Sequence, residues 1–127
     1  MIVAGVGYRN AASADDIDAV VRRAMATASV PAIDGLAVPA FKEMDIAAAA
    51  CVAKAFGVRL MRMTDADLAK AAPNCVTAMS HAMPGCGSAS VAEAAALAAA
   101  GPGACLLLAR IADARATCAL ATDGVDR

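Results

Sequence analysis

Short apolar segments alternate along the chain with longer segments of helical spacing, and this alternation limits the folds that the chain can adopt. Residues 2–6 and 105–108 are uniformly apolar, as expected for strands buried on both faces. A longer segment places Ile17, Val20 and Ala24 at helical spacing. This order of strands and helices predicts an α/β fold, a three-layer α/β/α sandwich with a mixed, mostly parallel sheet of about five strands.

Capping and turn residues set the expected boundaries of these elements. Ser13 begins one helix, Thr64 with Asp67 begins a short one, and the glycines around Pro102 end the last. The short connection between the last two strands predicts an antiparallel hairpin. The strands are expected at residues 2–7, 36–39, 58–63, 104–109 and 115–121, and the helices at 13–28, 42–56, 64–71 and 90–100.

The least regular part of the chain covers residues 73–89 and holds Pro84, Gly85 and Gly87. We expect a surface loop there, with a helical turn over residues 76–81. Together the expected elements form a single domain over residues 1–122, and residues 123–127 form a frayed tail.

Composition excludes several classes of partner. The net charge is -1, from 11 basic and 12 acidic residues. The chain therefore has no excess of positive charge that would attract nucleic acid or an anionic membrane. The longest stretch without a polar or charged side chain, residues 94–109, is shorter than the roughly 20 residues that span a bilayer. The first residues lack signal-peptide features, and the five cysteines form no C-x-x-C pair. We therefore expect a cytoplasmic protein with reduced thiols that binds neither nucleic acid nor a membrane.

The first candidate site is the turn after the first strand, because ligands of open α/β sheets bind beyond the carboxyl ends of strands. This turn holds Gly7, Tyr8, Arg9 and Asn10. Gly5 and Gly7 would let the backbone approach a ligand, and Arg9 would donate to a carboxylate. The alternative is a tight turn with a solvated arginine, since two glycines without a third are a weak signal for a nucleotide.

A second candidate site lies at the start of the last helix. Ser90 and Glu93 have the spacing of a capping box, in which each side chain accepts a hydrogen bond from a backbone N–H group. Ser88, Ser90 and the free N–H groups at this helix end would also bind a carboxylate. A cap and an anion site can share one helix terminus.

A third cluster, Cys75, His81 and Cys86, contains residue types that bind zinc. Its spacing matches no usual zinc motif and no fourth ligand is evident, so we expect no metal and no cofactor. Ser80 with His81 has no identifiable acid partner, which argues against a hydrolase triad.

The residues from Ser90 to Leu97, together with those from Met1 to Asn10, resemble the CobE/CbiG C-terminal family of cobalamin biosynthesis. In that family a strand leads into a Gly-x-Gly-Cys-Arg-x-Gly-like turn, and a later Ser-Val-Ala-Glu-x-Ala-Ala-Leu segment opens a helix. The resemblance covers nearly the whole chain. Tyr8 replaces the usual cysteine, so no role of that cysteine transfers.

The resemblance implies a role in building the corrin ring of vitamin B12. A related domain is fused behind the N-terminal part of an enzyme that opens a ring lactone of a cobalt-precorrin. This chain resembles the stand-alone form, so that activity is not carried over. We expect it to bind a corrinoid or precorrin such as hydrogenobyrinic acid, as a carrier that works with other corrin biosynthesis enzymes.

Such a ligand is a flat macrocycle ringed by acetate and propionate groups, and it needs an apolar face bordered by donors. Two alternatives stay open: an enzyme that acts on a precorrin, with Glu93 or His81 in proton transfer, and a domain that binds a partner protein of the pathway. The donor candidates are Arg9, Asn10, Lys42, Ser88 and Ser90.

If Ser90 caps the last helix, Ser90→Ala lowers the free energy of unfolding by about 1 kcal/mol, because an N–H group of the first turn loses its acceptor. Denaturant unfolding of the two proteins measures the difference. An unchanged midpoint would show that the helix begins elsewhere.

Overall fold

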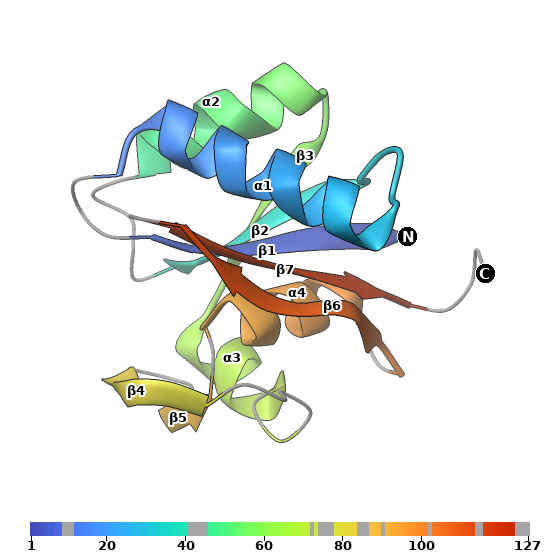
Figure 1. Cartoon of the computed structure of the whole chain (residues 1–127). Helices are drawn as coiled ribbons and strands as arrows, with labels where there is room; N and C mark the ends of the chain where they lie inside the picture. The colour runs from blue at the N-terminus through green and yellow to red at the C-terminus, as the bar shows by residue number, and fades with distance from the viewer. Residues whose placement is uncertain are drawn as a thin grey trace.

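In the computed structural model, the protein is built on a five-stranded sheet with helices on both faces (Figure 1). The structure describes residues 1–8, 12–40, 46–71, 73, 78–83, 87–89, 91–101, 103–113 and 116–123. Along the chain the elements are β1 (Ile2–Tyr8), α1 (Ala14–Ala28), β2 (Gly35–Pro39), α2 (Ile46–Phe56), β3 (Arg59–Met63), α3 (Asp65–Ala71), β4 (Ala78–Met83), β5 (Gly87–Ala89), α4 (Val91–Ala100), β6 (Cys105–Ala112) and β7 (Ala116–Thr122).

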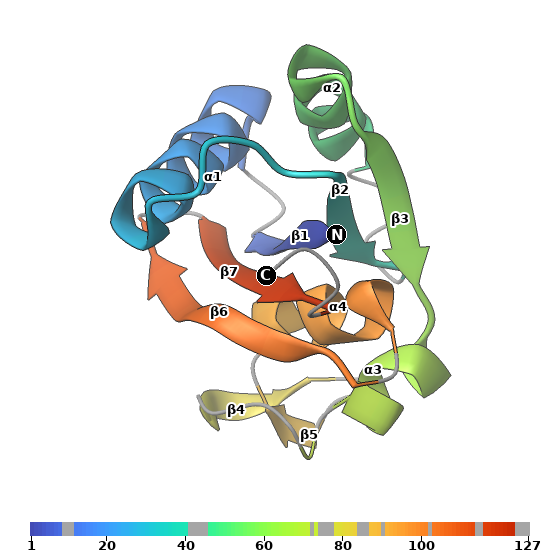
Figure 2. The same ribbon diagram turned by 90° about the vertical axis from the view of Figure 1, so that its right-hand side faces the viewer.

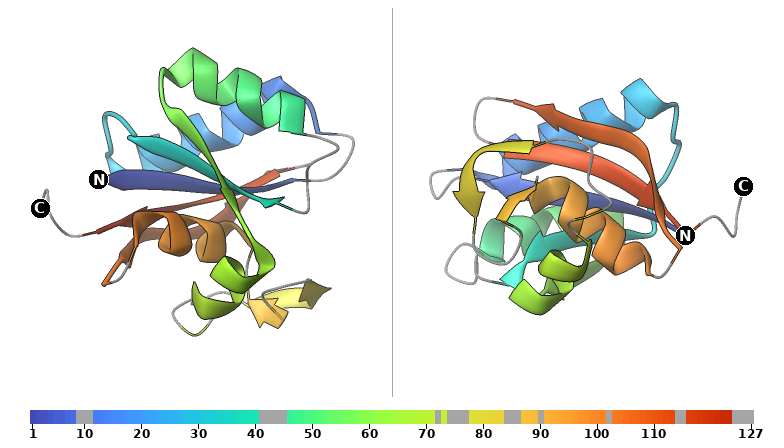
Figure 3. Two further views of the ribbon diagram at one scale, coloured as in Figure 1. Left: turned by 180° about the vertical axis from the view of Figure 1, so that it is seen from behind. Right: turned by 90° about the horizontal axis from the view of Figure 1, so that it is seen from below.

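The strands of the large sheet lie in the order β3-β2-β1-β7-β6. β1 pairs with β2 and β2 with β3 in parallel, while β7 pairs antiparallel with both β1 and β6. Among the described strands of this sheet, β7 therefore runs against the other four. With α1 and α2 on one face and α4 and α3 on the other (Figures 2 and 3), the mixed three-layer sandwich and the final hairpin predicted from the sequence are confirmed.

Alternation along β1 divides the core into two layers. Ala4, Val6 and Tyr8 belong to the cluster beneath α1 and α2, which also contains Ile17. Val3, which points the other way, belongs to the cluster around α4. The apolar stripe of α1 and the Ala-rich face of α4 thus cover opposite faces of the same strand.

Gly5 faces α4 and allows an unusually close approach of the helix to the sheet. A methyl group built on Gly5 would collide with the carbonyl oxygen of Ala92 and lie 2.8 Å from the Cβ of Ala96. Only a residue without a side chain fits this position, and only small residues on the facing side of α4 permit the contact.

Two of the expected helix starts have the predicted cap. Ser13 Oγ accepts from the Asp16 N–H group at 3.2 Å, and the Ser13 N–H group donates to Asp16 Oδ2 at 2.9 Å. Thr64 and Asp67 make the same reciprocal pair at 3.1 and 3.0 Å. The prediction for Ser90 lies outside the described residues.

The segment expected to be a loop with a helical turn contains a small sheet instead. β4 and β5 pair antiparallel, so the prediction of a helical turn over residues 76–81 is wrong for the described part, which is extended from Ala78 onward. The connection between the two strands is only three residues and begins with Pro84 and Gly85, a pair typical of tight turns. Local strand pairing then satisfies backbone groups that a loop would leave to water.

The end of β7 is joined to the start of β1. The Asp123 N–H group donates to the Met1 carbonyl oxygen at 3.3 Å, and Asp123 Oδ1 forms an ion pair with the Met1 amino group at 2.9 Å. The tail predicted from the sequence begins at Asp123, and the rest of it lies outside the described residues. Within the described residues, no helix combines the length and apolar character needed to cross a bilayer.

The contact at Gly5 predicts a large cost for Gly5→Ala, about 3 kcal/mol of unfolding free energy, because the added methyl group meets backbone atoms that cannot move alone. Denaturant unfolding measures this loss.

Gly7→Ala is the matched control on the same strand. Its methyl group would meet the side-chain oxygen of Thr117 at 2.9 Å, which can rotate away, so we expect a loss of about 1 kcal/mol. Equal losses in the two variants would contradict the close packing of α4 on β1.

Candidate functional site

The carboxyl ends of β1 and β2 meet the start of α4 at one edge of the sheet. β1 and β2 are parallel, with Gly5 opposite Ala37, so both strands end at this edge. α4 begins there as well, because a methyl group built on Gly7 would lie 3.7 Å from Val91 Cγ1. This edge of the sheet, called the β1–α4 edge below, has the geometry expected of a ligand site in an open α/β sheet.

Four of the predicted site residues, Arg9, Asn10, Lys42 and Ser90, lie outside the described residues. In the sequence Arg9 and Asn10 directly follow β1. Lys42 comes three residues after the end of β2, and Ser90 directly precedes α4. Ser88 lies in β5. The binding roles of these residues stay predictions.

The structure places Tyr8 and Gly5 in the packing of the sheet. Tyr8 is buried in the core cluster beneath α1 and α2, on the opposite face from α4. The space beside Gly5 is filled by α4, and not open to a ligand as the sequence suggested. Gly7 is half-buried, and its carbonyl oxygen accepts from Thr117 Oγ1 at 3.3 Å.

Glu93, in the first turn of α4, is fully buried, and its carboxylate is hydrogen-bonded to the backbone of β6. Its Oε2 atom accepts from the backbone N–H group of Arg110 at 2.8 Å. Leu108 pairs with Leu120 and Ile111 with Cys118, so two residues of β6 stand opposite one residue of β7. Arg110 is one of those two, and the carboxylate of Glu93 thus satisfies an N–H group inside a β-bulge.

This burial bears on the enzyme alternative, because a carboxylate without exposed surface cannot meet a substrate at the protein surface. The prediction for His81 concerns a side chain outside the described part of the structure, as do those for Cys75 and Cys86. In the described parts of the chain, no three His, Cys, Asp or Glu side chains are grouped to hold a metal ion. Burial raises the pKa of the Cys118 thiol to about 12, so that thiol stays protonated.

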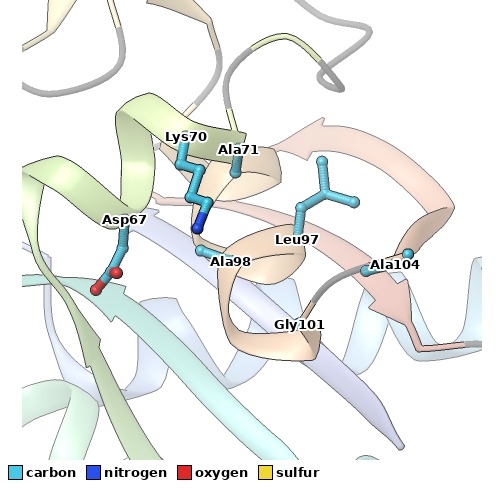
Figure 4. A pocket seen from close by; sticks show the side chains of 8 residues that line it. Asp67, Lys70, Ala71, Leu97, Ala98, Gly101 and Ala104 are labelled. Carbon is cyan, nitrogen blue, oxygen red and sulfur yellow. The ribbon is translucent and has the colours of Figure 1, made fainter.

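A cleft of about 490 Å³ opens between α3 and the last turn of α4, and the sequence reasoning missed it (Figure 4). The cleft lies at the C-terminal end of α4, whereas Val91 is at the N-terminal end. A helix of this length separates its two ends by about 15 Å. The sequence predicted both helices but held no signal for the contact between them. The main lining residues are Asp67, Lys70, Ala71, Leu97, Ala98 and Gly101.

Comparison with known proteins identifies close relatives. Residues 2–121 match the family described as cobalamin synthesis G C-terminus. The crystal structure of cobalamin biosynthesis protein chiG from Agrobacterium tumefaciens str. C58 is 37% identical, with a TM-score of 0.78 over 96% of this chain and 98% of that one. The crystal structure of CobE, a protein from the cobalamin (vitamin B12) biosynthetic pathway, is 30% identical in sequence and has a TM-score of 0.79. The match covers 95% of this chain and 89% of CobE. No curated protein matches.

The contact between Glu93 and the bulge predicts that Glu93→Ala lowers the free energy of unfolding by about 3 kcal/mol, since a buried N–H group loses its acceptor and a cavity forms. Glu93→Gln keeps an oxygen acceptor of the same size and should cost about 1 kcal/mol. Thermal or denaturant unfolding of the three proteins tests this. A loss in Glu93→Gln as large as in Glu93→Ala would contradict the proposed geometry.

Proposed function

The chain belongs to the cobalamin synthesis G C-terminus family, and we propose that it binds a corrinoid or precorrin such as hydrogenobyrinic acid at the β1–α4 edge. The observation that carries the proposal is the meeting of two parallel strand ends with the start of α4. Ligands of open α/β sheets bind in the crevice beyond the carboxyl ends of the strands, which is where this edge lies.

The start of α4 supplies hydrogen-bond donors for the ligand's carboxylates. The first N–H groups of a helix have no acceptor within the helix, and the helix dipole places partial positive charge there. Acetate and propionate groups on the rim of a corrin ring are the matching acceptors. Because Val91 lies against Gly7, these donors stand directly beside the end of β1.

Cations that adjoin this edge in the sequence complete the proposed site. Arg9 follows β1 and Lys42 follows β2, and the chain as a whole has a net charge of -1. Attraction of an anionic macrocycle therefore depends on local cations and not on a long-range field. In the proposal Arg9 and Lys42 pair with peripheral carboxylates, while Asn10, Ser88 and Ser90 donate hydrogen bonds.

Binding is favoured over catalysis by the position of Glu93. Its carboxylate, a candidate for proton transfer, is buried and bonded to Arg110. The protein therefore acts in this proposal as a carrier that delivers the corrinoid to another enzyme of the pathway.

Titration with hydrogenobyrinic acid, followed by its absorption spectrum, tests the proposal. Arg9→Ala should weaken binding by about 1 to 3 kcal/mol, the scale of a charge-assisted hydrogen bond, with little change in folding. Arg59→Ala is the matched control, because Arg59 is an exposed arginine at the start of β3. Higher salt should weaken binding, and a corrinoid whose side chains are amidated should bind less well than the acid.

Equal affinity of the wild-type protein and Arg9→Ala would rule out this site. No binding of any corrinoid would favour the domain that binds a partner protein, and conversion of the added corrinoid would show an enzyme.

A further inference from the structure

The cleft between α3 and α4 lies outside the proposed corrinoid site and has its own chemistry. Its volume of about 490 Å³ falls within the range of roughly 300–1,000 Å³ typical of small-molecule sites. Ala71, Leu97 and Ala98 give it apolar walls, and the view in Figure 4 shows the Lys70 side chain extending from α3 toward α4.

The charged groups of the cleft are one acid and one base on the same helix. The backbone N–H and the hydroxyl of Thr64 hold the pKa of Asp67 below its usual value, so its carboxylate is charged at neutral pH. One Asp67 oxygen is occupied by this cap, which fixes the side chain at the edge of the cleft. Lys70 supplies an ammonium group that balances the charge.

The opposite wall is the end of α4, where the last carbonyl oxygens of a helix have no partner within the helix. Residue 102 is a proline and has no N–H group, so it cannot donate to the carbonyl oxygen of Ala98 four residues earlier. Among the described residues, no other N–H group donates to that oxygen. The last carbonyl groups of a helix also carry partial negative charge, which favours a cationic donor.

We propose that this cleft binds a small zwitterion with an apolar body, the chemistry of an apolar α-amino acid. The ligand's carboxylate pairs with Lys70, its ammonium group donates to the carbonyl groups at the end of α4, and its side chain packs on Leu97 and Ala98. A simple anion fits less well, because Asp67 and the helix end both repel it. The site does not depend on the corrinoid proposal.

L-leucine is the probe, and two analogues separate its charges. 4-Methylpentanoate lacks the ammonium group, and 3-methylbutylamine lacks the carboxylate. Binding to the ¹⁵N-labelled protein is followed by amide chemical shifts. We expect leucine to shift the amides of α3 and of residues 97–104, and each analogue to bind at least about fivefold more weakly.

Three variants test the assignment of the walls. Lys70→Ala should weaken leucine binding by about fivefold, whereas Lys54→Ala, an exposed lysine on α2, should not change it. Ala98→Leu fills the cleft without changing its charge and should abolish binding. The amide spectrum of each variant without ligand shows that the fold is retained.

The proposal is overturned if leucine shifts no amide of the cleft, or if both analogues bind as well as leucine. It is also overturned if Lys70→Ala lowers stability but leaves leucine affinity unchanged, since Lys70 would then act only on the end of α4.

Discussion

α4 packs closely on β1, and this contact fixes the positions of both ends of the helix. Gly5 has no side chain on this face, so the backbone of α4 near Ala92 and Ala96 lies directly against the strand. This contact places Val91 beside Gly7 at the end of β1 and places the last turn of α4 beside α3. The composition, 61% hydrophobic and 2% aromatic, suits such a contact because alanines fill the helix face.

The two ends of α4 offer opposite chemistry as a result. Its first turn presents N–H donors where β1 and β2 end, which suits the carboxylates of an anionic macrocycle. Its last turn presents carbonyl acceptors beside Lys70, which suits a ligand that carries both charges. Between these ends, the Glu93 carboxylate accepts a hydrogen bond from the Arg110 N–H group in the bulge of β6.

Local patterns in the sequence predicted the five-stranded sheet, the four helices and the caps at Ser13 and Thr64, because apolar runs and capping residues act over a few positions. The pairing of β4 with β5 was missed, since neither strand carries a clear alternation of apolar residues. The roles of Gly5 and Glu93 and the cleft beside Lys70 depend on contacts between segments distant in the sequence, which no local pattern encodes. The expected binding residues Arg9, Asn10, Lys42 and Ser90 lie outside the described residues, so their roles stay predictions.

Hydrogen–deuterium exchange with and without hydrogenobyrinic acid tests whether a corrinoid binds where β1 ends and α4 begins. If it does, we expect slower exchange in peptides that cover residues 5–12 and 87–94, with no change across β6 and β7. Protection confined to α3 and residues 97–104, or binding without protection at either segment of the β1–α4 edge, would contradict this expectation.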